Sequence, residues 1–255
     1  MTLNDEAAEQ AATLLEKAWT SGKRLPSLPD ACRPRSHAQA YRIQQALAER
    51  LGPTGGWKVG APGPEAPRHY APLPARFLSR EAATCRLADF SRVLLEAELA
   101  FTLACDLPPR DTPYETREVV AAVASLNPVI EIVDSRYQDW PDGIDALSQL
   151  ADLQNHGCLV VGEGITRWQT MALEKVAVCL VLNGKSRVTA DGGNPAGDPL
   201  PLLVWLANHL PTQGQWLRAG DVVTCGSCTG KLPVNHPVEV AVSFEGVGEA
   251  RVTLV

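Results

Sequence analysis

Two apolar runs that contain glutamates constrain the fold of this chain most. The first, Val93–Phe101, contains Glu96 and Glu98, and the second, Pro128–Val133, contains Glu131. Their apolar, partly β-branched composition predicts buried strands. An ionised carboxylate in a buried strand is unfavourable unless positive charge meets it. The fold must therefore bring a cation or a basic side chain to these strands.

The spacing of the glutamates narrows the alternatives. Side chains alternate between the two faces of a strand, so Glu96 and Glu98 point the same way, roughly 7 Å apart along the backbone. Such a pair is most often the solvated face of an amphipathic strand. Glu131 favours a buried site instead, because both its neighbours are β-branched. Its partner is either a divalent metal with hard oxygen ligands or an ion pair with Lys58 or Arg136.

Length and charge limit the class of protein. A chain of 255 residues fits one large domain, or a core domain with a smaller helical segment before it. The net charge of −6 and the lack of basic runs argue against nucleic acid or a membrane surface as a partner. Seven scattered cysteines and the polar, acidic first residues indicate reduced thiols and no signal peptide. We expect a cytoplasmic protein that does not span a membrane.

Hydrophobic periodicity and turn residues predict the elements. The expected helices cover 4–20, Ser36–Leu51, 115–126 and 200–210. The expected strands are Trp57–Val59, the two glutamate runs, 156–162, 175–183, 221–225, 237–244 and 249–254. The proline-rich residues 61–76 predict an irregular loop, a kind of segment that often serves as a lid. Strands dominate the second half, with one helix inserted, which indicates an α+β fold.

Several familiar motifs fail on inspection. Gly184-Lys185-Ser186 resembles the end of a phosphate-binding loop, but Cys179 stands where that loop needs a glycine. Cys225 and Cys228 form a C-x-x-C without a second ligand pair for zinc or the context of a redox motif. Ser227 between them is not in a nucleophile elbow.

Lys58 and His69 are the candidate proton-transfer residues. Lys58 lies between Trp57 and Val59 with glycines beyond both. A lysine near a metal and aromatic walls is expected to have a lowered pKa, which suits proton transfer, although a surface strand lysine is the simpler interpretation. His69 lies in the proline-rich segment and could face a site or solvent. His156, at the start of a predicted strand, is given no chemical role.

Several segments, taken in order, resemble one known family. They are Gln39–Gln44, Gly56–Gly60, Leu95–Phe101, Pro128–Arg136, Gly197–Leu200, Trp205–Asn208, Gly220–Val223 and Gly226–Ser227. In order and spacing the chain resembles the fumarylacetoacetate hydrolase superfamily, in the branch of 2-keto-4-pentenoate hydratases and 4-oxalocrotonate decarboxylases.

The resemblance implies a fold and a metal site. It implies an α+β chain with a mixed β-roll, here as a metal-binding catalytic domain over residues 56–255, and an N-terminal helical segment packed on it over residues 1–55. It implies Mg²⁺ or Mn²⁺ held by Glu96, Glu98 and Glu131, with Lys58 as the acid/base. Relatives carry an acidic residue after the lysine strand, where this chain has Pro67–Leu73. Either His69 takes over that role in proton transfer, or the substrate differs.

The resemblance also implies an activity. We expect a lyase, a hydro-lyase that adds water to a 2-hydroxy-2,4-dienoic acid of the 2-keto-4-pentenoate type, in the catabolism of aromatic compounds. Ser227, Gln44 and Arg136 are the candidates to orient the small anionic substrate, although Arg136 could equally form a structural salt bridge. The alternatives are decarboxylation of a vinylogous 2-oxo acid, hydrolysis of an acylpyruvate C–C bond, or a non-catalytic subunit. We expect a homo-oligomer, with a decarboxylase or aldolase as a conceivable partner.

Overall fold

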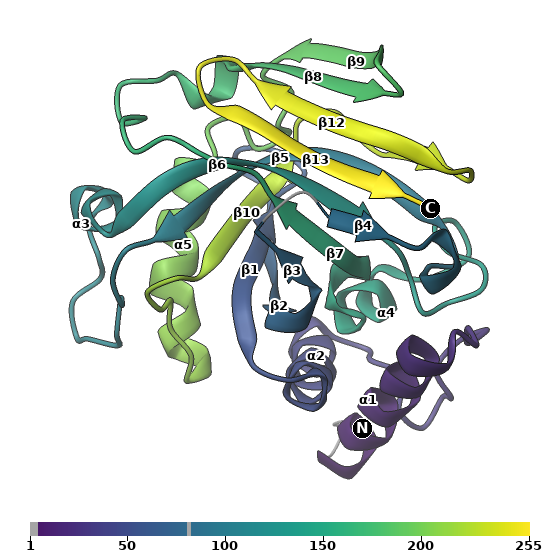
Figure 1. Cartoon of the computed structure of the whole chain (residues 1–255). Helices are drawn as coiled ribbons and strands as arrows, with labels where there is room; N and C mark the ends of the chain where they lie inside the picture. The colour runs from purple at the N-terminus through teal and green to yellow at the C-terminus, as the bar shows by residue number, and fades with distance from the viewer. Residues whose placement is uncertain (1–4, 81–82) are drawn as a thin grey trace.

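The computed structural model describes residues 5–80 and 83–255, which form two mixed β-sheets flanked by helices (Figure 1). The larger sheet has the strand order β2-β1-β10-β5-β6-β7-β3, and β11 also pairs with β5. Its strands are β1 Thr54–Gly60, β2 His69–Pro74, β3 Leu78–Ser79, β5 Val93–Leu103, β6 Val123–Val133, β7 His156–Val161, β10 Val222–Ser227 and β11 Leu232–Val234. Parallel and antiparallel pairs coexist in it, which confirms the predicted mixed sheet and α+β class.

The smaller sheet has the order β4-β13-β12-β8-β9. Its strands are β4 Ala83–Cys85, β8 Ala177–Leu182, β9 Lys185–Asp191, β12 Val238–Phe244 and β13 Gly248–Leu254. Every second residue of β12 is buried, from Val238 to Phe244, as expected for a strand with one face on a core. This face packs against β6 of the larger sheet, and Figure 1 shows β12 and β13 lying along that strand.

The two long central strands decide where the glutamates point. In β5 the side chains of Leu95, Ala97 and Leu99 join the core shared with the smaller sheet. Because successive side chains alternate between faces, Glu96 and Glu98 project from the opposite face of the larger sheet. The same alternation in β6 sends Ile130 and Ile132 into the shared core and Glu131 away from it. All three carboxylates therefore share one face.

Helices cover that face or flank the sheet. The helices are α1 Asp5–Ser21, α2 His37–Leu51, α3 Thr116–Ala121, α4 Ala146–Ala151 and α5 Leu200–His209. The first helices were predicted with nearly these bounds, and Ser36 caps α2 by accepting from the N–H of Gln39 at 3.3 Å. They pack with α4 over Leu94 and Val133 of the sheet, on the side away from β12 (Figure 1). The division into segments 1–55 and 56–255 stays a prediction.

Two predicted segments are wrong in part. A capping box between Glu115 and Glu118 starts α3 as expected, but the chain passes into β6 at Val123, where pairing with β5 overrides the local helical pattern. The predicted loop 61–76 ends early, because His69–Pro74 forms β2. Prolines are tolerated there because β2 lies at the edge of the sheet, next to β1, in the strand order of the described residues. Helix α4 and the strands β3, β4, β9 and β11 were not predicted either.

The structure bears on two features expected from composition, the state of the cysteines and the presence of membrane-spanning helices. Each of the seven cysteines is a free thiol, as predicted. Within residues 5–80 and 83–255, none of the helices combines the length and the apolar character needed to cross a bilayer.

Candidate active site

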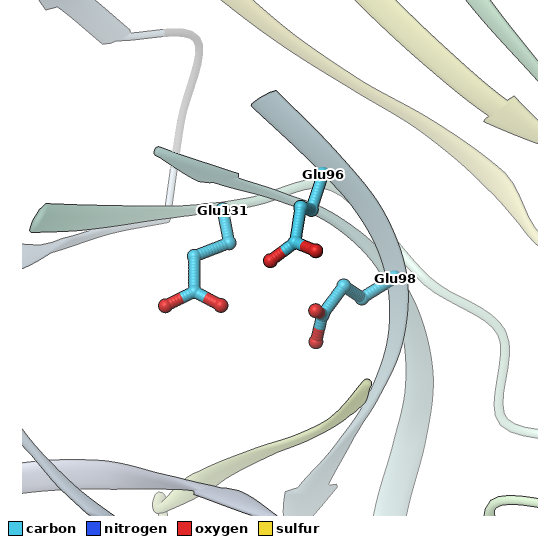
Figure 2. Close-up of side chains that lie close together, drawn as sticks. All are labelled: Glu96, Glu98 and Glu131. Atoms are coloured by element: carbon cyan, nitrogen blue, oxygen red, sulfur yellow. The ribbon is translucent and has the colours of Figure 1, made fainter. Parts of the chain in front are cut away.

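Three glutamate side chains form a compact acidic cluster. Glu96 and Glu131 lie directly opposite each other in the β5–β6 register, and Glu98 follows two residues along β5. One carboxylate oxygen from each lies within 4.8 Å of the others, and Figure 2 shows the three carboxylates turned toward a common space. The exposed fractions are 9% for Glu96, 2% for Glu98 and 0% for Glu131. Buried, oxygen-only donors at this spacing fit a divalent cation such as Mg²⁺ or Mn²⁺.

The neighbouring strand β10 orients Glu98. The Thr224 hydroxyl and the Gly226 N–H, at 3.0 Å for the latter, both donate to Oε2 of Glu98. Gly226 has a φ of 94°, a conformation that favours glycine, at the register shift between Thr224 and Ser227. Burial, followed by the charges of Glu131 and Glu96, raises the pKa of Glu98 to about 8. Glu98 therefore ionises fully near neutral pH only when further positive charge enters the cluster.

Lys58 forms the basic edge of the cluster. Its Nζ lies 2.6 Å from Oε1 and 2.8 Å from Oε2 of Glu131. Burial alone would raise the pKa of Glu131, but Lys58 and His156 outweigh it and bring that pKa to about 2. Burial lowers the pKa of Lys58, yet Glu131, Glu98 and Glu96 together raise it further, so it lies above its usual value. The lowering expected for a lysine beside a bound metal stays a prediction, because these three carboxylates act on Lys58 here without the charge of an ion.

A pocket of about 350 Å³ opens beside the cluster. Most of the predicted site residues line it: Lys58, His69, Glu96, Glu98 and Ser227. Glu131 lies behind Lys58, fully buried. Ser227 is opposite Glu98 in the β10–β5 register and its hydroxyl interacts with Glu96. The pocket thus combines the acidic cluster with two lysines, two histidines and the Ser227 hydroxyl, since Lys231 and His37 also line it, in a space that suits a small organic acid.

His69 lies further along the pocket on the same sheet face as Lys58. In the β1–β2 register Lys58 is opposite Ala71 and Gly60 is opposite His69, so the Lys58 and His69 side chains project from the same face. The His69 Nδ1 lies 3.4 Å from the Tyr41 hydroxyl. Its ring stacks on His37 with centroids 5.0 Å apart. Burial and then His37 lower the pKa of His69, which favours the neutral imidazole.

Two candidates for substrate binding lie outside the pocket. The Gln44 amide donates to the carbonyls of Tyr70 at 3.2 Å and Leu150 at 2.7 Å, and so ties α2 to β2 and α4. The Arg136 side chain is 1% exposed, and its Nε lies 2.6 Å from Asp152 Oδ1. Neither residue is among those that line this pocket, and their roles in substrate binding stay predictions.

Two residues of the site were missed from the sequence: one is buried behind the cluster and the other lines the pocket. His156 is 0% exposed, and its Nδ1 lies 3.1 Å from Oε1 of Glu131. Lys231 lines the pocket and acts on Glu96 as a nearby positive charge. The strand containing His156 was predicted, but a register shift between Ile132 and Val133 hides which residue faces Glu131. Lys231 follows a glycine in a loop, where no sequence period places a side chain.

The chain resembles known proteins over nearly its whole length. Residues 39–255 match the family described as Fumarylacetoacetate (FAA) hydrolase C-terminal. The chain is 30% identical to a 2-keto-4-pentenoate hydratase of Paraburkholderia xenovorans, across 98% of this chain and 95% of that protein. It is 24% identical to a 4-oxalocrotonate decarboxylase of Pseudomonas putida, across 100% and 99%. A solved 4-oxalocrotonate decarboxylase from Pseudomonas putida, complexed with magnesium and adipate, shares the fold: the TM-score is 0.87 at 22% identity, covering 100% and 99% of the chains.

Proposed function

The chain belongs to the fumarylacetoacetate hydrolase family, and from that premise we propose that it is a divalent-metal-dependent hydro-lyase. In this proposal it adds water to a 2-hydroxy-2,4-dienoic acid and releases a 4-hydroxy-2-oxo acid, as a step in the catabolism of aromatic compounds. The relatives named 2-keto-4-pentenoate hydratase support the reaction class. The observation that carries the proposal is Lys58 held against Glu131 at the edge of a three-carboxylate cluster, beside one pocket.

The cluster supplies the metal ligands in this proposal. Glu96, Glu98 and Glu131 would hold Mg²⁺ or Mn²⁺, and the raised pKa of Glu98 is the feature of this site that such an ion would relieve. A bound divalent ion would polarise the C2 oxygen of the substrate and stabilise negative charge there. The acidic cluster without an ion would repel an anionic substrate, so binding of ion and substrate should be linked.

The basic and neutral side chains carry the proton transfers. A bound ion would offset the three carboxylates that raise the Lys58 pKa, so that the neutral amine of Lys58 could accept the proton of the C2 hydroxyl and return a proton to C5, which converts the dienol into a conjugated ketone. The neutral His69 ring accepts a proton from the water that adds at C4, and C3 is protonated in turn. Ser227 donates a hydrogen bond that orients the substrate carboxylate. Overall one water is gained and no bond of the carbon chain breaks.

Product identification tests the proposal. The protein is incubated with 2-hydroxypenta-2,4-dienoate, with Mg²⁺ or with a chelator, and the products are identified by mass spectrometry. We expect Mg²⁺-dependent gain of one water. Recovery of the unchanged dienoate under all conditions would contradict the hydratase assignment.

Metal ligation has its own test. Glu131→Gln removes one negative charge from the cluster, so it should weaken Mg²⁺ binding in a calorimetric titration. Glu174→Gln, a change on the surface away from the cluster, is the matched control. Unchanged Mg²⁺ affinity in Glu131→Gln would rule out ligation by that residue.

Decarboxylation is the second candidate. It is favoured by the relative named 4-oxalocrotonate decarboxylase and by Lys231, whose ammonium at the pocket could meet a second carboxylate. The same incubation with 4-oxalocrotonate separates the two reactions, since release of CO₂ marks the decarboxylase. Hydrolysis of an acylpyruvate has weaker support, because the candidate base His69 has no carboxylate hydrogen-bonded to it in the described residues.

Assembly and location belong to the same proposal. A small anionic organic acid is the partner that the site suits. We propose a cytoplasmic homo-oligomer, which light scattering on the purified protein would test. Co-purification with a decarboxylase or aldolase would test the wider complex.

A further inference from the structure

His156 lies directly behind Glu131, on the side away from the pocket. It is the first residue of β7, its side chain is fully buried, and its Nδ1 is 3.1 Å from Oε1 of Glu131. An ionised carboxylate can only accept hydrogen bonds, so the hydrogen must lie on Nδ1. The other ring nitrogen, Nε2, has no hydrogen-bond partner among the described residues. The polar interaction of this ring is therefore directed to Glu131 alone.

Several contacts fix the place of this ring. The backbone carbonyl of His156 accepts from Nη1 of Arg136 at 2.7 Å. Arg136 is held in turn by Asp152 at 2.6 Å. The ring of Phe77 meets the imidazole edge-on, with centroids 6.4 Å apart. The ring has little freedom to turn away from Glu131.

The backbone just before His156 adopts an unfavourable conformation, and this turn places His156 at the start of β7. Leu153, Gln154 and Asn155 have φ values of 49°, 51° and 58°, in the left-handed region that residues with a side chain rarely adopt. Three such residues in succession persist only where surrounding contacts enforce them, and such turns gather at functional sites. This turn also directs the Gln154 carbonyl to Lys58 Nζ, at 3.4 Å. The strained turn thus serves both groups that contact Glu131.

The two oxygens of Glu131 are not equivalent. Oε1 accepts from Lys58 at 2.6 Å and from His156 at 3.1 Å, and so uses both of its lone pairs. Oε2 accepts from Lys58 alone in the described part of the chain, at 2.8 Å, and keeps one lone pair free. A cation can therefore bind Oε2 while Lys58 and His156 stay in place. At Oε1 it would have to displace one of them.

We infer that His156 is a positioning residue that holds the Glu131 carboxylate so that Oε2 is the oxygen offered to a divalent cation. The inference rests on the metal site of the proposed function and adds a residue that site did not include. Partners that orient a metal-binding carboxylate stabilise the bound geometry, and their loss typically weakens metal binding by about 10–100-fold. The effect of His156 should therefore appear in metal affinity, separately from its packing in the core.

Two variants separate positioning from packing. His156→Phe keeps an aromatic ring against Phe77 but removes the N–H. His156→Asn removes the ring but keeps an amide N–H close to the position of Nδ1. Mg²⁺ dissociation constants are measured by calorimetry, and thermal unfolding is followed in parallel. His209→Phe, on α5 with its ring stacked on Trp205, is the matched control for a histidine remote from Glu131.

We expect the two variants to rank in opposite order for Mg²⁺ affinity and for thermal stability. His156→Phe should bind Mg²⁺ about 10–100-fold more weakly, whereas His156→Asn should stay within about threefold of the unmodified protein. Thermal stability should fall more in His156→Asn, which leaves space in the core. Equal Mg²⁺ affinity in His156→Phe and the unmodified protein would overturn the inference and leave the metal site standing. Failure of the unmodified protein to bind Mg²⁺ would overturn both.

A spectroscopic measurement on the unmodified protein does not depend on the phenylalanine variant. Long-range ¹H–¹⁵N spectra of the unmodified protein report which imidazole nitrogen carries the hydrogen. We expect a histidine with the hydrogen on Nδ1 whose resonances move on addition of Mg²⁺ and are absent in His156→Asn. The hydrogen on Nε2 instead, or no response to Mg²⁺, would contradict the positioning role even if the phenylalanine variant failed to fold.

Discussion

The ion pairs Lys58–Glu131 and Arg136–Asp152 are both buried, yet they are built differently. Arg136 and Asp152 are 1% and 0% exposed in their side chains. The guanidinium donates to Asp152 Oδ1 and to the carbonyls of Asp152 and His156. Oδ2 of Asp152 accepts from the Arg136 N–H at 3.0 Å and from Ser135 at 3.1 Å. Every charge in this pair has a partner inside the protein.

The Lys58–Glu131 pair is unbalanced by comparison. Lys58 is 13% exposed in its side chain and lies at the pocket. Its single positive charge faces the carboxylates of Glu96 and Glu98 as well as that of Glu131. A buried pair with all groups satisfied specifies structure, whereas surplus charge beside a cavity marks a site for a ligand. The following predictions test this distinction, from the largest expected effect to the smallest.

Breaking the Arg136–Asp152 pair, called the closed pair because all its charged groups have partners inside the protein, should destabilise the fold most. Arg136→Met leaves Asp152 buried and unpaired, which should lower the free energy of unfolding by about 3–5 kcal/mol in urea titrations. Adding Asp152→Leu removes the stranded charge and should recover much of that loss. A double variant no more stable than the single one would show that the pair is not a self-contained unit.

Breaking the Lys58–Glu131 pair, called the open pair because it lies at the pocket with unbalanced charge, should affect catalysis more than folding. Lys58→Met should reduce turnover of 2-hydroxypenta-2,4-dienoate by about 10²–10⁴-fold, the usual contribution of a general acid/base. In saturating Mg²⁺ the unfolding free energy should change less than in Arg136→Met, since the ion still neutralises Glu131. Lys185→Met, on the exposed part of β9, is the control. Near-normal turnover in Lys58→Met would remove its assigned role.

The surplus charge should make the metal-free protein sensitive to alkaline pH. Burial and the neighbouring carboxylates raise the pKa of Glu98 from 4.5 to about 8. Folding therefore favours the protonated form of Glu98. Its contribution to the free energy of unfolding is fully present below about pH 4.5 and is lost as the pH rises through 8. With a chelator, the melting temperature should fall by a few degrees, on the order of 1–2 kcal/mol, between pH 6 and 9.

Two controls isolate this effect. Mg²⁺ should abolish the alkaline fall, and Glu98→Gln should remove it without Mg²⁺, because no charge then forms at that position. The pH dependence due to Glu131 has the opposite sign. Because its pKa is about 2 in the folded protein, its contribution to stability is lost as the pH falls toward 2. An alkaline fall of equal size in Glu98→Gln would assign the titration to another group.

A conservative exchange in the closed pair should have the smallest effect. Arg136→Lys keeps the positive charge, but one ammonium cannot reach all the acceptors that the planar guanidinium serves. One buried acceptor left unpaired should lower the free energy of unfolding by about 1–3 kcal/mol, with Mg²⁺ affinity nearly unchanged. If the binding free energy of Mg²⁺ fell by more than the free energy of unfolding, Arg136 would belong with Lys58 and Glu131 instead.

The sequence by itself determined the features that depend on local pattern. Alternation within β5 puts Glu96 and Glu98 on one face whatever the rest of the chain does, and the β-branched neighbours of Glu131 fix it in a buried strand. The cap at Ser36 likewise marks the start of α2. These signals also supported the family resemblance, and they predicted the acidic cluster and its lysine.

Only the tertiary structure decided which charges meet. Lys58 rather than Arg136 pairs with Glu131, and His156 contacts the same carboxylate, because strands far apart in the chain are aligned with register shifts that no local pattern encodes. Arg136 lies next to a predicted site segment but is turned away into Asp152. Partner choice between buried charges depends on positions fixed to within an ångström or so, and packing of the whole chain sets those positions.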